Sequence, residues 1–213
     1  MKKKPFIGFW NYTVYLTYVG LISAIIGIIE AAKGKIGFAL GCLCFTAVCD
    51  TFDGKIARSK KDRTDDEKLF GVQIDSLCDV VSFGIFPPVF FYGLGIDSTI
   101  GVVVLAFYGT CAVVRLAYYN VLETSKMAKP VAGPSVYMGL PVTTIALFAP
   151  IFYLCMLVLP PLTAEIVVTV GLFMVAVLFI LNFKVKKPTN GQLAIIAVVM
   201  AAILGAIIKI KLS

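Results

Sequence analysis

The sequence contains no histidine among its 213 residues. This absence excludes nucleophilic catalysis by Ser-His-Asp or Cys-His arrangements and removes the usual base at neutral pH. If the protein transfers protons, a carboxylate is therefore the expected base. Metal sites would be built from oxygen ligands, which suits magnesium, manganese or calcium. The six cysteines form no C-x-x-C pair, so a cysteine-only zinc site is not favoured.

Charged residues are scarce, at 15% of the chain, whereas a soluble domain carries about 25%. They are clumped, which leaves apolar runs of about 20 residues, the length that spans a bilayer as a helix. We therefore predict an all-α fold, a polytopic transmembrane helical bundle that forms a single membrane domain over residues 1–213.

Seven apolar runs are candidate spans. They cover residues 12–30, 36–57, 71–94, 98–121, 137–159, 163–183 and 191–210. The first run could be mistaken for a secretory signal, but its apolar stretch is too long and no convincing cleavage site follows it.

Lysine and arginine gather on one side of these spans. With the N-terminus inside, 15 of the 19 basic residues face the same side, and positive charge favours the cytoplasm. We therefore expect a protein of the cytoplasmic membrane with its N-terminus in the cytoplasm. The net charge of +7 indicates attraction to anionic membrane lipids. The loops lack the interleaved aromatic and basic residues that bind single-stranded nucleic acid, so no nucleic-acid partner is expected.

One stretch, "CDTFDGKIARSKKDRTDDEKLFGVQIDSLCD" at residues 49–79, holds eight of the twelve carboxylates. Asp50 and Asp53 are three residues apart at the end of the second span, and Asp75 and Asp79 are four apart in the third. Each pair therefore lies on one helix face, and the two faces can meet if the helices are antiparallel. This end of the two spans is predicted to face the cytoplasm.

A carboxylate at the centre of a span costs roughly 2.5–3.5 kcal/mol, and four converging carboxylates would also repel one another. Bound cations would remove this cost, and an oxygen-only ligand set favours one or two divalent ions. The alternative is a solvated helix end with capping acids. Among the four, Asp79 could serve as a general base toward a hydroxyl.

Small residues accompany the acids: Gly54 and Ala57 follow Asp53, and Gly71 precedes Asp75. They would let a flat ligand approach the backbone, although helix packing could explain them equally well. Arg58 is a planar donor suited to phosphate oxygens. Together these residues predict a nucleotide diphosphate site.

The pattern Asp50-x-x-Asp53-Gly54-x-x-Ala57-Arg58, followed by Gly71-x-x-x-Asp75-x-x-x-Asp79, resembles the signature of the CDP-alcohol phosphotransferases. These membrane enzymes displace CMP from a CDP-linked lipid with an alcohol. Twelve residues separate Arg58 from Gly71, where the family usually has about eight.

The resemblance implies a homodimer with a core of six spans, so that the last of the seven would be additional. It implies two divalent ions, Mg²⁺ or Mn²⁺, held by the four aspartates, and an Asp79 that takes the proton from the alcohol. The nucleotide would be bound by Asp50, Asp53, Gly54, Ala57, Arg58 and Gly71.

Further stretches are similar to the bacterial and archaeal membrane-embedded phosphatidylserine synthases. They are "DSLCDVVSFGIFPP", "RLAYYNV", "YMGLPVT" and "NFKVKKP". This resemblance implies transfer of the phosphatidyl group from CDP-diacylglycerol to the hydroxyl of L-serine, with CMP as the other product. Without this resemblance, the Gly-Leu-Pro of residues 139–141 would simply break the start of a helix. Tyr118, Tyr119 and Tyr137 would then be aromatic residues at the membrane interface.

Arg115 lies inside the fourth span, where a guanidinium is costly and usually functional. It could neutralise the lipid phosphates or the carboxylate of serine, and Asn120 is a weaker candidate for the same pocket. Glycerol 3-phosphate or inositol phosphate as the acceptor would call for a second basic cluster. A cation transporter would carry acids through several helices, whereas the acids of the other spans lie at or near their ends.

Overall fold

The protein is described here by a computed structural model covering residues 7–60, 62–128 and 137–185, together with residues 202–203, 205–207 and 209–210. Its helices are α1 (Tyr12–Ala32), α2 (Ile36–Ser59), α3 (Asp65–Asp79), α4 (Phe86–Gly93), α5 (Thr99–Ala128), α6 (Ile145–Val158) and α7 (Pro161–Ile180). A π-helix, η1 (Val80–Ile85), joins α3 to α4, and a 3₁₀ turn, η2 (Val142–Thr144), precedes α6.

Among the residues that the structure describes, five helical segments are long and apolar enough to cross a membrane, and a shorter apolar segment covers Val142–Val158. The prediction of a polytopic helical bundle is confirmed, and the chain is that of an integral membrane protein. Six of the predicted spans correspond to these helical segments. The seventh, at residues 191–210, lies mostly outside the described residues, although those described there are helical.

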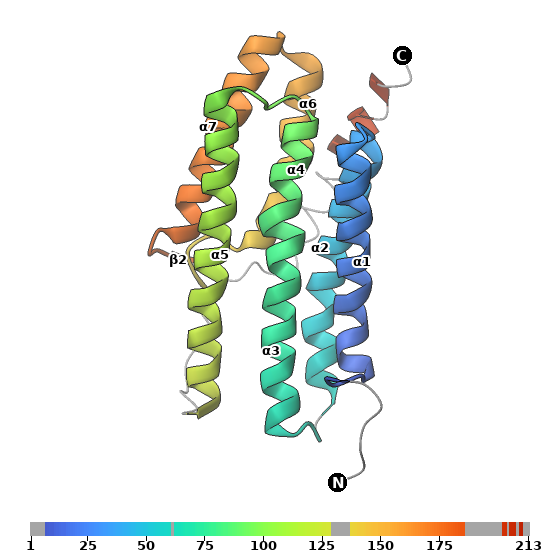
Figure 1. The fold of residues 1–213 in the computed structure, drawn as a ribbon, viewed down its shortest axis with the longest axis vertical. Helices are drawn as coiled ribbons and strands as arrows, with labels where there is room; N and C mark the ends of the chain where they lie inside the picture. The colour runs from blue at the N-terminus through green and yellow to red at the C-terminus, as the bar shows by residue number, and fades with distance from the viewer. Residues whose placement is uncertain are drawn as a thin grey trace.

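The helices run side by side, with α3 and α4 in the middle, α1 and α2 on one side, and α5 and α7 on the other (Figure 1). The start of α1, the connection from α2 to α3 and the end of α5 share the lower end of the bundle. The turns from α1 to α2, from α4 to α5 and from α6 to α7 lie at the upper end. The lower end is the one that the distribution of basic residues predicts to be cytoplasmic.

The third span begins earlier than predicted, at Asp65 rather than at residue 71. A capping box explains this start: Thr64 Oγ1 accepts a 3.2 Å hydrogen bond from the Glu67 backbone N–H, and Glu67 Oε2 accepts one of 3.1 Å from the Thr64 N–H. Asp65, Asp66 and Glu67 also place negative charge in the first turn, where the helix dipole favours it. The connection to α2 is therefore short.

Helix α3 continues through η1 into α4 as one span, Asp65–Gly93. Pro87 has no backbone N–H, so the carbonyl of Phe83 lacks its usual helical donor. The hydroxyl of Tyr108 on α5 supplies the missing bond, donating to Phe83 O at 3.0 Å. Both side chains are fully buried in the core that α5 and this span share.

The segment before α6 is not helical from residue 137, and that predicted boundary was wrong. Strand β1 (Tyr137–Met138) pairs antiparallel with β2 (Lys184–Val185) beyond the end of α7. Gly139 has a φ of +69°, and a side chain there would meet the carbonyl oxygens of Phe179 and Leu181. Two of the stretches singled out in the sequence are thus neighbours in space.

Candidate active site

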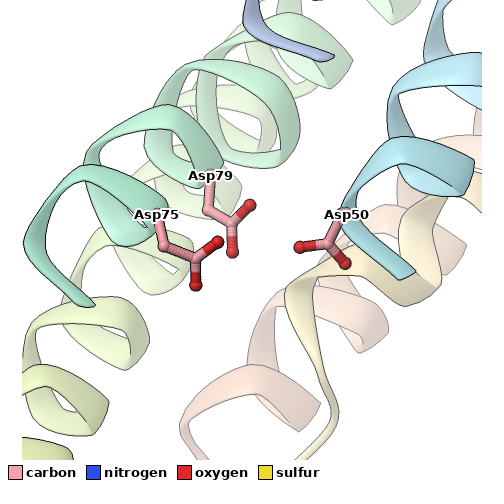
Figure 2. A group of neighbouring side chains, drawn as sticks. All are labelled: Asp50, Asp75 and Asp79. Atoms are coloured by element: carbon pink, nitrogen blue, oxygen red, sulfur yellow. The ribbon is translucent and has the colours of Figure 1, made fainter. Parts of the chain in front are cut away.

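Three aspartate side chains converge between α2 and α3. Asp50 projects from α2, and Asp75 and Asp79 project toward it from α3 (Figure 2). One carboxylate oxygen from each lies within 4.8 Å of those of the other two. The spacing of four residues puts Asp75 and Asp79 on one face of α3, so both can point at the same place. We call these residues the three-aspartate group.

Asp53, the fourth predicted acid, lies one turn along α2 from Asp50. It is buried, and Thr17 on α1 donates a 2.9 Å hydrogen bond from Oγ1 to its Oδ2. Its carboxylate also lies beside that of Asp75. Asp53 thus connects the three-aspartate group to α1.

Thr17 was not among the predicted site residues. A signal for it exists, because Thr13 and Thr17 are four residues apart and place two hydroxyls on one face of an apolar helix. Both threonines are buried against the acidic helices and line the same cavity as Asp53.

This cavity, which we call the first cavity, has a volume of about 180 Å³ and is lined by α1, α2, α3 and the connection before α3. Asp53 and Asp75 lie on its wall. The three small residues predicted to form a ligand slot, Gly54, Ala57 and Gly71, line it as well. The cavity therefore joins the acidic residues to a surface with little side-chain bulk.

Two basic side chains that were not predicted also line the first cavity, Arg63 and Lys68. Arg63 donates hydrogen bonds to the backbone carbonyls of Glu67, at 2.8 Å, and Ala57, at 3.4 Å. Lys68 pairs with Asp65 at 2.9 Å on the exposed side of α3. Arg58 is part of α2, but its side chain lies outside the described part of the structure.

Arg115 lies on α5 and is only 7% exposed. Its guanidinium stacks on the ring of Tyr119, 4.4 Å from the ring centre, and it interacts electrostatically with Asp79. It lines a second cavity of about 310 Å³, between α5 and the end of α7. The remaining lining residues are Val114, Tyr118, Tyr119, Phe179, Ile180, Leu181 and Asn182.

Asn120, predicted to share a pocket with Arg115, takes another place. Its Oδ1 accepts a 2.7 Å hydrogen bond from Ser76 Oγ, which links α5 to α3 next to Asp75. It is not among the residues that line the second cavity. Its contact suits a role in holding α3 against α5.

The donor set of this site fits a divalent cation. The three-aspartate group offers carboxylate oxygens from two helices, and Asp53 adds a fourth carboxylate close by. Oxygen ligands of this kind suit Mg²⁺, Mn²⁺ or Ca²⁺ rather than zinc or copper. The group could therefore hold a metal ion beside the first cavity, whose wall includes Asp75.

The chain is similar in sequence to known proteins over most of its length. The family model for CDP-alcohol phosphatidyltransferases matches residues 10–181, which include every site residue described above except Asn182. The chain is 37% identical over 112 residues to the CDP-diacylglycerol–serine O-phosphatidyltransferase of Saccharomyces cerevisiae, a match that covers 52% of this chain and 38% of that protein.

Two further relatives match over more of their length. The archaetidylserine synthase of Methanothermobacter thermautotrophicus is 29% identical, with 72% of this chain and 62% of that protein covered. The CDP-diacylglycerol–serine O-phosphatidyltransferase of Helicobacter pylori is 25% identical, and the match covers 90% of this chain and 78% of that protein. The chain spans only about two fifths of the yeast and mycobacterial relatives.

Proposed function

Because the chain belongs to the CDP-alcohol phosphatidyltransferase family, we propose that it transfers the phosphatidyl group from CDP-diacylglycerol to the hydroxyl of L-serine. The products would be phosphatidylserine and CMP. The observation that carries the proposal is the convergence of Asp50, Asp75 and Asp79, one of which, Asp75, lines the same cavity as Gly54, Ala57 and Gly71. The serine acceptor is supported by the names of the yeast and Helicobacter relatives.

Asp50, Asp75 and Asp79, with Asp53 beside them, are the residues that would hold divalent cations, for which we propose two ions of Mg²⁺ or Mn²⁺. When bound, such ions supply charge neutralisation for the diphosphate and for the CMP that leaves. The small residues of the first cavity would admit the nucleoside. Arg58 would be a further hydrogen-bond donor to the phosphate oxygens. Binding energy at the nucleotide then orients the reacting phosphorus.

Asp79 is the proposed general base. It is a member of the three-aspartate group, does not line the first cavity, and interacts with Arg115 from the second cavity. Its membership of the three-aspartate group and its interaction with Arg115 suit a base that receives a proton from an acceptor near Arg115 while the nucleotide is bound beside the aspartates.

The reaction needs one displacement. The serine hydroxyl gives its proton to an Asp79 carboxylate oxygen, and the serine oxygen bonds to the phosphorus that carries diacylglycerol. The bond from that phosphorus to the CMP oxygen breaks, and its electron pair leaves with CMP. Positioning and charge stabilisation account for most of the rate in such a transfer.

The second cavity is the proposed acceptor site. Arg115 at its wall can bind the carboxylate of serine through two parallel N–H groups. The electrostatic interaction between Arg115 and Asp79 is consistent with an acceptor held with its hydroxyl near the base. We propose that Asn120 acts indirectly, by holding α3 in place through Ser76.

We further propose that the enzyme is a homodimer in the cytoplasmic membrane, with its site open to the cytoplasm. The excess of basic residues on one side supports this orientation, because 15 of 19 share the side of the acid-rich segment.

One assay tests the function directly. The purified protein in detergent receives CDP-diacylglycerol with Mg²⁺ or Mn²⁺, and CMP release is measured with L-serine, glycerol 3-phosphate and inositol phosphate in parallel. We expect release with L-serine that a chelator abolishes and added metal restores. Release with a phosphorylated acceptor alone would overturn the serine assignment, and no metal-dependent release with any acceptor would overturn the proposed chemistry.

A further inference from the structure

Arg63 lies in the short connection that separates α2 from α3, within a segment that is longer than the family spacing. Its guanidinium extends over the backbone of α3 at the outer end of the first cavity. A side chain at Gly71 would collide with Arg63 Nη2, so glycine at this position leaves room for the guanidinium. Gly71 therefore accommodates the guanidinium of Arg63.

The hydrogen bonds of Arg63 leave one edge of the guanidinium available. An arginine has five N–H donors, and the described bonds engage Nη1 with the Ala57 carbonyl and Nη2 with the Glu67 carbonyl. The Nε atom is buried and has no hydrogen-bond partner within the described part of the chain. A buried donor without an acceptor is costly, so this edge suits an acceptor that a ligand brings into the cavity.

The depth of Arg63 indicates which part of a nucleotide it would meet. Gly71 precedes Asp75 by four residues, which is about 6 Å along the helix. Under the proposed function, the diphosphate lies at the three-aspartate group, at the inner end. The base would then reach the outer end, where Gly71, Ala57 and Arg63 lie together.

We propose that Arg63 recognises the cytosine base of the nucleotide, an inference that rests on the proposed function. Cytosine presents two adjacent acceptors, O2 and N3, which match the N–H of Nε and the second N–H of Nη2, the one not directed at the Glu67 carbonyl. Uracil carries an N–H at position 3, so the same edge of Arg63 would face a donor. Arg63 thus selects cytidine nucleotides over uridine nucleotides.

Binding of CMP and UMP tests this. The purified full chain in detergent with Mn²⁺ is titrated with each nucleotide, and wild type is expected to prefer CMP. Arg63→Ala should lower the affinity for CMP by at least about tenfold and the affinity for UMP much less, so that the preference collapses. Arg63→Lys keeps the charge but loses the planar fork, and it should lose the preference as well.

Lys60→Ala is the matched control. Lys60 lies in the same connection and pairs with Glu67 at 3.2 Å, but it does not line the first cavity. This variant should keep the preference for CMP. Detergent gel filtration and thermal unfolding measure whether each variant is folded. If Arg63→Ala does not fold, Arg63→Lys tests the proposal instead.

Several outcomes overturn the proposal. If the Arg63 variants lose affinity equally for CMP and UMP, Arg63 contacts the phosphate rather than the base. If they gain affinity equally for both, Arg63 obstructs the cavity. Unchanged affinities would leave it a packing residue, and a collapsed preference in Lys60→Ala would assign the effect to general charge. If wild type binds neither nucleotide in the presence of metal, the proposed function itself fails, which is distinguishable from a failure at Arg63 alone.

Discussion

The Thr17 hydroxyl on α1 donates a 2.9 Å hydrogen bond to the Asp53 carboxylate on α2. Both side chains are buried, at 9% and 6% exposed. The bond orients the acid that connects the three-aspartate group to α1. A helix that contributes no aspartate to the group thereby helps to set its geometry.

Replacing Thr17 by Val removes this hydrogen bond while keeping the shape of the side chain. Loss of a contact that orients a metal-binding carboxylate typically costs about 10–100-fold in metal affinity. We therefore expect the Mg²⁺ or Mn²⁺ concentration for half-maximal CMP release to rise by at least about tenfold. Thr17→Ser keeps the hydroxyl and should stay near wild type, and identical metal dependence in all three proteins would contradict the assigned role.

Replacing Asp79 by Asn keeps the size of the side chain but removes its basicity. Turnover should fall by about 100-fold or more, because the serine hydroxyl loses its proton acceptor. CMP release under single-turnover conditions measures this step, and CMP binding should persist. Asp66→Asn, in the exposed first turn of α3, is the control and should retain turnover. Near-normal turnover of Asp79→Asn would remove the base from the proposed mechanism.

Replacing Arg115 by Lys keeps a positive charge in the second cavity but loses the planar pair of donors and the stacking on Tyr119. We expect the KM for L-serine to rise by about tenfold or more while the KM for CDP-diacylglycerol changes little. Steady-state kinetics with each substrate varied in turn measures the two KM values separately. A rise confined to CDP-diacylglycerol would mean that Arg115 contacts the lipid phosphates.

Replacing Tyr108 by Phe leaves the buried carbonyl of Phe83 without the donor that compensates for Pro87. An unsatisfied buried carbonyl costs about 1–3 kcal/mol, so the melting temperature in detergent should fall. Tyr92→Phe makes the same chemical change on an exposed side chain of α4 and should have little effect. Equal melting temperatures for Tyr108→Phe and wild type would show that another donor replaces the hydroxyl.

The acidic residues were predictable because helix geometry is a local rule. Spacings of three and four residues map onto one helix face, so the sequence alone indicates that Asp75 and Asp79 point together. The small residues near them are also readable from spacing, and Gly54, Ala57 and Gly71 do line one cavity. Which of the four aspartates share the tightest group required the relative placement of two helices.

Thr17 and Arg63 depend on packing between segments, which spacing does not encode. A threonine in an apolar helix is an ordinary packing residue until its partner on another helix is known. Arg63 sits in a charged stretch whose side chains could equally have been solvated. Its place over Gly71 follows from the capping box at Thr64, which brings the connection close against α3.

The wrong boundary at residue 137 has a similar cause. Apolar composition does not distinguish a helix from a short paired strand, and the partner strand at Lys184–Val185 is more than 40 residues away in sequence. The Gly-Leu-Pro turn was the local sign that a helix does not begin before it. A positive φ at Gly139 and the missing N–H of Pro141 agree with that sign.

The early start of α3 gives the lengthened segment between Arg58 and Gly71 a structural meaning. The six residues from Asp65 to Phe70 extend α3 by about 9 Å before Gly71, so they raise the rim of the first cavity. A protein with a shorter segment would have a shallower entrance, and its choice of nucleotide would have to be made by residues deeper in the membrane.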